Sequence, residues 1–133
     1  MSAENLDRLK VLLVEDRDDS RAMIKNMLSE IGITQVFEAT NGREGLDFMD
    51  MSFDFVDVVL CDWNMPRMKG IDFLKQLRSV DAEFPFLMLT GRGDMNSVAE
   101  AKGAGVTGYI LKPFSLTQLE AKLRVVYYKL GIA

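Results

Sequence analysis

The chain has 133 residues, of which 48% are hydrophobic and 27% charged, a composition that suits one folded domain and excludes a disordered chain. Its 16 basic and 20 acidic side chains give a formal net charge of −4, so we expect no nucleic acid partner. The chain contains no histidine, which excludes Ser-His-Asp catalysis, Cys-His catalysis and zinc sites that use histidine.

The N-terminal segment lacks the apolar stretch of a secretory signal, and no apolar run approaches the length of a membrane span. We therefore expect a single cytoplasmic domain over residues 1–133, with no membrane partner and with a flexible N-terminus at residues 1–8. The lone cysteine, Cys61, has no disulfide partner within the chain, and we expect it in the core.

The first half of the chain alternates apolar runs with stretches of helical periodicity. Runs at residues 11–14, 35–39 and 56–61 predict three strands. A turn at Asn41-Gly42 precedes a predicted short helix with Leu46 and Met49 on its inner face. The first predicted helix ends at Gly32, and its inner face carries Met23, Ile24, Met27, Leu28 and Ile31.

The second half continues the same alternation. A helix that ends near Val80 is followed by predicted strands at residues 86–89 and 109–111, with a weak, alanine-faced helix from Met95 to Lys102 between them. The last helix is predicted to begin at Ser115, where Gln118 completes a capping box. The inner faces of the third and last helices carry Ile71, Leu74, Leu77, Leu116, Leu119, Leu123, Val126, Tyr127 and Leu130.

Strict alternation of apolar strands and helices indicates parallel strands covered on both faces. With right-handed crossovers, the pattern predicts an α/β fold: a doubly wound (βα)5 three-layer sandwich of the flavodoxin-like kind, with strand order 2-1-3-4-5.

Polar residues follow four of the five predicted strands. Glu15 and Asp16 follow the first strand and Asp62 the third, and these two strands are neighbours at the switch in strand order, where such sheets bind ligands. Thr90 and Lys112 would flank the three carboxylates from the next strands. Crowded carboxylates need a counter-charge, and oxygen ligands suit Mg²⁺, for which Mn²⁺ could substitute, so the pattern predicts a site for Mg²⁺ and a phosphoryl group. Asp62 is then the candidate nucleophile.

Four motifs in this order resemble the receiver domains of two-component response regulators, over residues 10–130. The segment from Asp62 to Pro66 is most similar to that of the stand-alone chemotaxis receivers. The motifs are Leu13-Val14-Glu15-Asp16, Cys61-Asp62-Trp63-Asn64-Met65-Pro66-x-Met68-x-Gly70, Leu89-Thr90-Gly91 and Gly108-Tyr109-Ile110-Leu111-Lys112-Pro113-Phe114.

The resemblance implies that Asp62 accepts a phosphoryl group from a histidine of a sensor kinase or phosphotransfer protein. It also implies that Thr90 and Lys112 contact that group and that the Lys112–Pro113 bond is cis. The implied Mg²⁺ ligands are Glu15, Asp16, Asp62 and the backbone carbonyl of Asn64. Glu15 stands where the family commonly has aspartate, and the longer side chain would reach the metal directly or through water.

The resemblance further implies a switch in which Thr90 moves toward the phosphoryl group and Tyr109 turns inward. This movement would change the face formed by the fourth helix, the fifth strand and the last helix, and with it the binding of an output protein. The identity of that protein is open; a flagellar motor switch is one candidate. We expect Asn64 and Arg92 to tune self-hydrolysis from either side of the phosphoryl group, with Gly91 leaving that group accessible.

Several alternatives remain at this stage. Tyr109 could be a half-buried structural residue, Trp63 could contact the site or a partner, and Asp18 and Asp19 suit capping better than metal binding. The domain could serve only as a phosphate sink for its kinase. An aspartyl-phosphate phosphatase is less favoured because position 64 holds Asn, and a flavin carrier because the acidic segment from Glu15 to Asp19 would repel phosphate. We expect a monomer, with dimerisation on activation as the alternative, and no enzymatic activity beyond self-phosphorylation and self-dephosphorylation.

Overall fold

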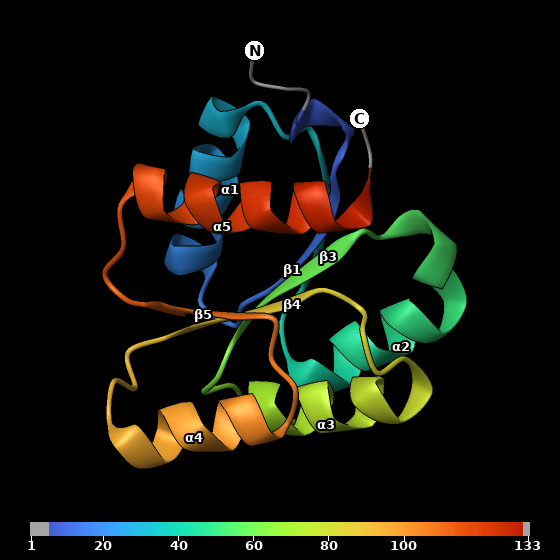
Figure 1. Cartoon of the computed structure of the whole chain (residues 1–133), viewed down its shortest axis with the longest axis vertical. Coiled ribbons are helices and arrows are strands. Elements are labelled where there is room, and N and C mark those ends of the chain that lie inside the picture. The colour runs from blue at the N-terminus through green and yellow to red at the C-terminus, as the bar shows by residue number, and fades with distance from the viewer. Residues whose placement is uncertain (1–5, 132–133) are drawn as a thin grey trace.

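The computed structural model describes residues 6–131, which form a five-stranded parallel sheet flanked by five helices (Figure 1). The strand order is β2-β1-β3-β4-β5, so the predicted α/β fold and its topology are confirmed. The strands are β1 (Lys10–Val14), β2 (Gln35–Ala39), β3 (Val58–Asp62), β4 (Phe86–Thr90) and β5 (Gly108–Leu111).

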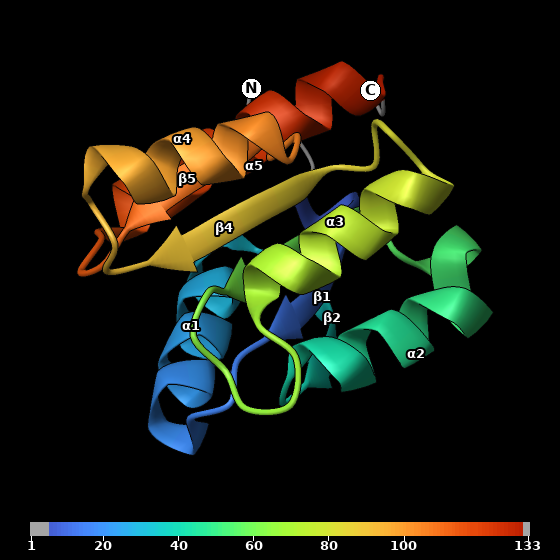
Figure 2. The same cartoon turned by 90° about the horizontal axis from the view of Figure 1, so that it is seen from below.

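The helices form two layers, one on each side of the sheet. In Figures 1 and 2, α1 (Asp18–Ile31) and α5 (Leu116–Leu130) cover one face. The other face is covered by α2 (Gly42–Ser52), α3 (Gly70–Val80) and α4 (Met95–Gly103). Two short 3-10 turns, η1 (Leu6–Arg8) and η2 (Phe53–Phe55), complete the described elements.

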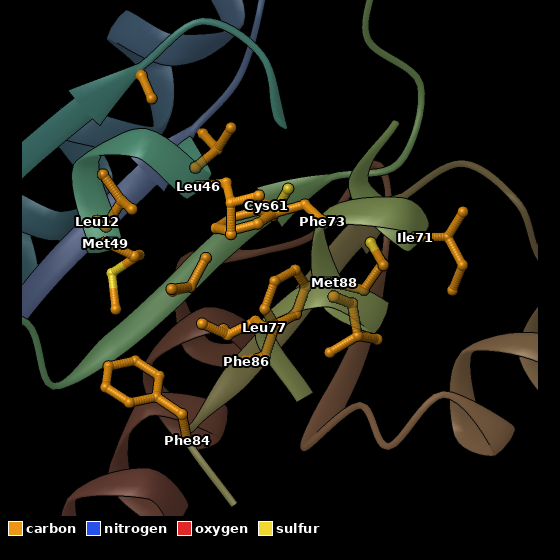
Figure 3. Close-up of a cluster of buried hydrophobic side chains, with 14 of the residues drawn as sticks. Leu12, Leu46, Met49, Cys61, Ile71, Phe73, Leu77, Phe84, Phe86 and Met88 are labelled. Atoms are coloured by element: carbon orange, nitrogen blue, oxygen red, sulfur yellow. The ribbon is translucent and has the colours of Figure 1, made fainter. Parts of the chain in front are cut away.

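Successive residues of the central strands point to opposite helical layers. Leu12 and Val14 belong to the core cluster under α2, α3 and α4, whereas Val11 and Leu13 belong to the cluster under α1 and α5. Because both faces are covered, β1, β3 and β4 are apolar almost throughout. Figure 3 shows the first cluster, where Phe73 of α3 meets Phe86 of β4 edge to face at 5.5 Å between ring centroids.

The helix boundaries follow the capping signals of the sequence. Gly32 ends α1 with a φ of 107°, a left-handed conformation that glycine adopts without steric cost, and its N–H donates to the carbonyls of Leu28 and Ser29. The predicted capping box of α5 is present: Ser115 accepts from the Gln118 backbone N–H, and the Gln118 side chain accepts from the Ser115 N–H. Asn41 caps α2 in a similar way by accepting from the Glu44 N–H.

Three details of the predicted elements are wrong. The third strand begins at Val58 rather than at residue 56, because η2 turns the chain and Asp57 is held by a bond from the Lys10 N–H to its carboxylate, at 2.9 Å. Met23 is 56% exposed because it borders a hollow beside the loop after β5 instead of the sheet. Leu130 is 38% exposed because it lies in the last turn of α5, at the rim of another hollow.

Part of the segment that we expect to be flexible has regular structure. Residues 6–8 form η1, and Leu6 is buried, together with Leu9, in the cluster under α1 and α5. Residues 1–5, the rest of the segment expected to be flexible, lie outside the described residues. Among residues 6–131, no helix has both the length and the apolar character needed to cross a bilayer.

Candidate phosphoryl and metal site

The site lies at the carboxyl ends of β1, β3, β4 and β5. The sheet register pairs Val14 with Cys61 and Thr90 with Leu111, so the residues that follow these strands emerge at the same edge. Glu15 follows β1, Asp62 ends β3 and Lys112 follows β5. The predicted convergence of these side chains is therefore a direct result of parallel pairing between neighbouring strands.

Three carboxylates gather at this edge. One oxygen each of Glu15, Asp16 and Asp62 lies within 4.8 Å of the others. Glu15 is only 1% exposed, and Asp16 and Asp62 are half-buried. The Glu15 carboxylate is also held by the backbone, since the Arg17 N–H donates to its Oε2 at 3.1 Å.

Lys112 supplies the positive charge of the cluster. Its Nζ donates to Glu15 Oε1 at 2.9 Å and to Asp62 Oδ1 at 3.3 Å. Its backbone N–H donates to the Thr90 carbonyl at 2.8 Å, which ties the loop after β5 to the end of β4. The Lys112–Pro113 peptide bond is cis.

The environment opposes the charged forms of the acids. Burial, aided by the charge of Asp62, raises the pKa of Glu15 despite its bonds to Lys112 and Arg17. Burial likewise raises the pKa of Asp62, although the charge of Lys112 acts in the other direction. Burial lowers the pKa of Lys112, but the bonds and charges of the two acids outweigh it and leave this pKa raised. One lysine therefore does not fully compensate the carboxylates.

This donor set fits a hard divalent cation. Carboxylate oxygens are the ligands that Mg²⁺ prefers, and three of them converge here with a net negative charge. Glu15, Asp16 and Asp62, three of the four predicted ligands, are thus brought together by the structure.

The loop after β3 is held against the strand by a close backbone contact that we did not foresee. A Cβ on Gly70 would lie 2.1 Å from the Asp62 carbonyl oxygen, and the Gly70 N–H donates to the Trp63 carbonyl at 2.9 Å. Only glycine fits this position without displacing Asp62. Gly70 is the last residue of the motif that begins at Cys61, but the sequence does not show this contact, because it depends on how the chain folds back.

Thr90 and Tyr109 meet at one backbone segment. Thr90 is fully buried, and its Oγ1 accepts from the Arg92 N–H at 3.1 Å. The Tyr109 hydroxyl donates to the Arg92 carbonyl at 2.6 Å, and its ring packs on the core cluster under α2, α3 and α4. The structure therefore places Tyr109 in an inward position, with both hydroxyls on the same residue of the loop after β4.

Asn64 and Arg92 contact each other. An Arg92 guanidinium N–H donates to Asn64 Oδ1 at 3.0 Å, and the guanidinium carbon lies 5.0 Å from the centre of the Trp63 ring. We expected Asn64 and Arg92 to act from either side of the site, and sequence reasoning missed this contact between the two loops. The sequence signal that could have indicated this contact is the presence of Arg92 after β4 and of the aromatic Trp63 after β3, since an arginine often stacks on an aromatic ring.

The acidic residues at the start of α1 do not join the metal cluster. Asp19 accepts from the Ser20 N–H, and Asp18 pairs with Arg21. The expectation that these two residues cap the helix is wrong, because the N-cap position is held by Arg17 without a side-chain cap bond and Asp18 and Asp19 lie within the first turn of α1. Cys61 is buried, and burial raises the pKa of its thiol.

Comparisons with known proteins agree with this geometry. Residues 11–124 match the response regulator receiver domain model. The chain is 42% identical over 120 residues to chemotaxis protein CheY1 of Helicobacter pylori, covering 89% of this chain and 96% of the relative. It is 39% identical over 124 residues to CheY-3 of Vibrio cholerae, covering 92% and 94% respectively. A receiver domain of Clostridium thermocellum superimposes with a TM-score of 0.86 at 26% identity, covering 93% of this chain and 98% of that one.

The raised pKa of Asp62 leads to a stability prediction. In a chelator at pH 7, Asp62→Asn should raise the free energy of unfolding by roughly 1 kcal/mol, because it removes one of the crowded, desolvated charges. The gain should shrink as pH falls through the raised pKa toward the ordinary carboxyl value, because Asp62 then becomes protonated and the penalty disappears from the unmodified protein. Urea unfolding across this pH range measures it.

The control for this experiment is Asp50→Asn, which removes an exposed carboxylate on α2 and should change stability by less than about 0.5 kcal/mol. A loss of stability in Asp62→Asn at pH 7 would contradict this prediction and show that the interaction of Asp62 with Lys112 outweighs the burial and repulsion of its charge.

Proposed function

The chain belongs to the response regulator receiver domain family, and from this membership we propose that it is a phosphorylation-controlled signalling switch with Asp62 as the phosphoryl acceptor. The observation that carries the proposal is the close approach of Glu15, Asp16 and Asp62 beside the Lys112 ammonium group. This arrangement combines a nucleophilic carboxylate, a cation site and a fixed positive charge.

The proposed reaction transfers a phosphoryl group between two proteins. An Asp62 carboxylate oxygen attacks phosphorus of a phosphohistidine on a sensor kinase or phosphotransfer protein, the N–P bond breaks, and the imidazole leaves with a proton from solvent. Self-dephosphorylation is the attack of water on the same phosphorus, which releases inorganic phosphate and restores the carboxylate. A bound Mg²⁺, held by Glu15, Asp16, Asp62 and the Asn64 carbonyl, would screen the charge that approaches Asp62.

Lys112 and Thr90 have distinct roles in this proposal. The Lys112 ammonium already donates to Asp62 Oδ1 and has further donors for a phosphoryl oxygen. The Thr90 hydroxyl accepts from the Arg92 N–H, so its own proton is available to a phosphoryl oxygen. Thr90 ends β4 and Lys112 directly follows β5, so both groups lie at the edge of the sheet that carries Asp62.

The proposed output is a change in the face formed by α4, β5 and α5. Tyr109 of β5 is bonded to the loop after β4, and phosphorylation would increase the population of this inward position relative to an exposed one. Apolar side chains already mark the face, since Met95 is 87% and Leu111 48% exposed. A weakly anchored α4, which buries only Ser97 and Ala101, can move at modest cost.

The relatives suggest the pathway. The two curated relatives named above are chemotaxis proteins, so we propose a role in chemotaxis or motility signalling, in the cytoplasm, where an ATP-dependent kinase operates. The output partner would be a motor component or another protein that prefers the phosphorylated form. A phosphate sink for the kinase remains the alternative function of the same chemistry.

A labelling experiment tests the acceptor. Incubation with acetyl [³²P]phosphate and Mg²⁺ should incorporate at most one phosphoryl group per chain, and Asp62→Asn should reduce the label to background. Asp50→Asn is the matched control and should label normally, because Asp50 is exposed on α2. A chelator should prevent labelling of the unmodified protein.

Two outcomes would contradict the proposal. Undiminished label on Asp62→Asn would exclude Asp62 as the acceptor. Continuous release of phosphate from phosphorylated metabolites, far beyond one equivalent, would show a phosphatase instead of a switch.

A further inference from the structure

The segment after β4 has one side chain with which to hold its position. Arg92 is flanked by Gly91 and Gly93, which have no side chains, and the segment leads into Asp94, the N-cap of α4. Within the described residues, a Cβ on Gly91 would touch nothing within 4 Å. The conformation of this segment therefore depends on the contacts of Arg92.

The Arg92 side chain crosses to the loop after β3. Its guanidinium stacks on Trp63, which is only 3% exposed, and donates to Asn64 Oδ1. We call this group of three residues, Arg92, Trp63 and Asn64, the Arg92 clamp. Trp63 and Asn64 directly follow the acceptor Asp62, so the clamp joins the loop that carries the acceptor to the loop after β4.

The Arg92 backbone holds the two hydroxyl groups that the proposed switch uses. Its N–H donates to Thr90 Oγ1, and its carbonyl accepts from Tyr109. A change in the position of Arg92 would thus change the orientation of both hydroxyls. The side chain of Arg92 thus contacts the loop after β3, which follows Asp62, and its backbone contacts Thr90 and Tyr109.

The contacts of the Arg92 clamp are weak enough to form and break reversibly. The Arg92 Nε atom is buried without a hydrogen-bond partner among residues 6–131, an arrangement that costs free energy because the lost contact with water is not replaced. The stacking on Trp63 and the bond to Asn64 contribute energies of similar size. The net stability of the clamp is therefore small, and events at Asp62 can change its population.

We propose that Arg92 is a positioning residue: its clamp on Trp63 and Asn64 fixes the loop after β4 so that Thr90 presents its hydroxyl to a phosphoryl group on Asp62. This inference rests on the proposed function, because it assigns Arg92 a role in phosphoryl binding. The evidence for the clamp itself is the geometry of the unliganded protein. It states that Asn64 and Arg92 act as one unit on the phosphoryl site.

The first test uses the unliganded protein and is independent of phosphorylation. Arg92→Ala should shift Trp63 emission to longer wavelength, because the ring loses its cover, and Trp63 is the one tryptophan in the chain. In the same variant, hydrogen exchange of the amide at position 92 should accelerate about tenfold or more, since the bond to Thr90 is no longer held in place. Arg92→Lys keeps the charge and should partly restore both signals.

The second test measures affinity for beryllofluoride, a phosphoryl analogue, in the presence of Mg²⁺. Arg92→Ala should weaken analogue binding about tenfold, the factor that corresponds to one hydrogen bond of roughly 1.4 kcal/mol, and leave Mg²⁺ affinity unchanged. Asn64→Ala, which removes no charge, should weaken it about threefold, and the double variant should be no weaker than Arg92→Ala alone. Arg43→Ala, on α2, is the control and should match the unmodified protein.

These measurements separate the inference from the proposed function. Unchanged Trp63 emission and amide exchange in Arg92→Ala would overturn the clamp, and so would additive effects of the two substitutions on analogue affinity. Unchanged analogue affinity despite a loosened loop would overturn the positioning role. Failure of the unmodified protein to bind the analogue would refute the proposed function and, with it, the positioning role, while the first test would still decide whether the clamp exists.

Discussion

The crowding of three carboxylates against one lysine is the interaction on which the rest of the structure depends. Two like charges about 4 Å apart repel by about 4 kcal/mol at an effective dielectric constant of about 20, and Lys112 alone does not cancel the repulsion among Glu15, Asp16 and Asp62. The fold imposes this crowding because β1 and β3, which carry the acids at their carboxyl ends, are neighbours in the sheet. Burial makes the cost larger, as the raised pKa values of Glu15 and Asp62 show. A bound divalent cation would offset this repulsion, because its charge is opposite to that of the three carboxylates.

Hydrogen bonds through Arg92 link the loop after β3, beside the carboxylates, to Tyr109 of β5. The hydroxyl groups of Thr90 and Tyr109 both form hydrogen bonds with the backbone of Arg92, and the Arg92 side chain donates to Asn64 in the loop after β3. Each of these contacts contributes little energy, so no part of the connection is rigid by itself. A connection of this kind can occupy two arrangements of similar free energy, and a charge added at Asp62 can change their populations. Regulation would then arise from several weak bonds acting together.

Sequence reasoning succeeded where one rule determines the outcome. Alternating strands and helices with right-handed crossovers gave the strand order, and the carboxyl ends of neighbouring strands gave the meeting of Asp62 with Glu15 and Asp16. It was less successful where several loops must be placed at once. The contact of Arg92 with Trp63 and Asn64 joins two loops whose conformations have no periodic pattern, and the approach of Gly70 to Asp62 depends on a backbone reversal. Met23 and Leu130 have helical spacing toward the core, yet both are exposed and border hollows in the surface, and apolar periodicity carries no information about where a surface is hollowed.

The central claim is that the three converging carboxylates form the binding site of a divalent cation. A crystal structure grown with Mn²⁺, a substitute for Mg²⁺ that can be located by its anomalous scattering, tests this claim most directly. The account predicts one Mn²⁺ ion that is ligated by carboxylate oxygens of Asp16 and Asp62, with Glu15 bound directly or through a water molecule. An ion bound elsewhere, with Glu15, Asp16 and Asp62 turned away from one another, would contradict it.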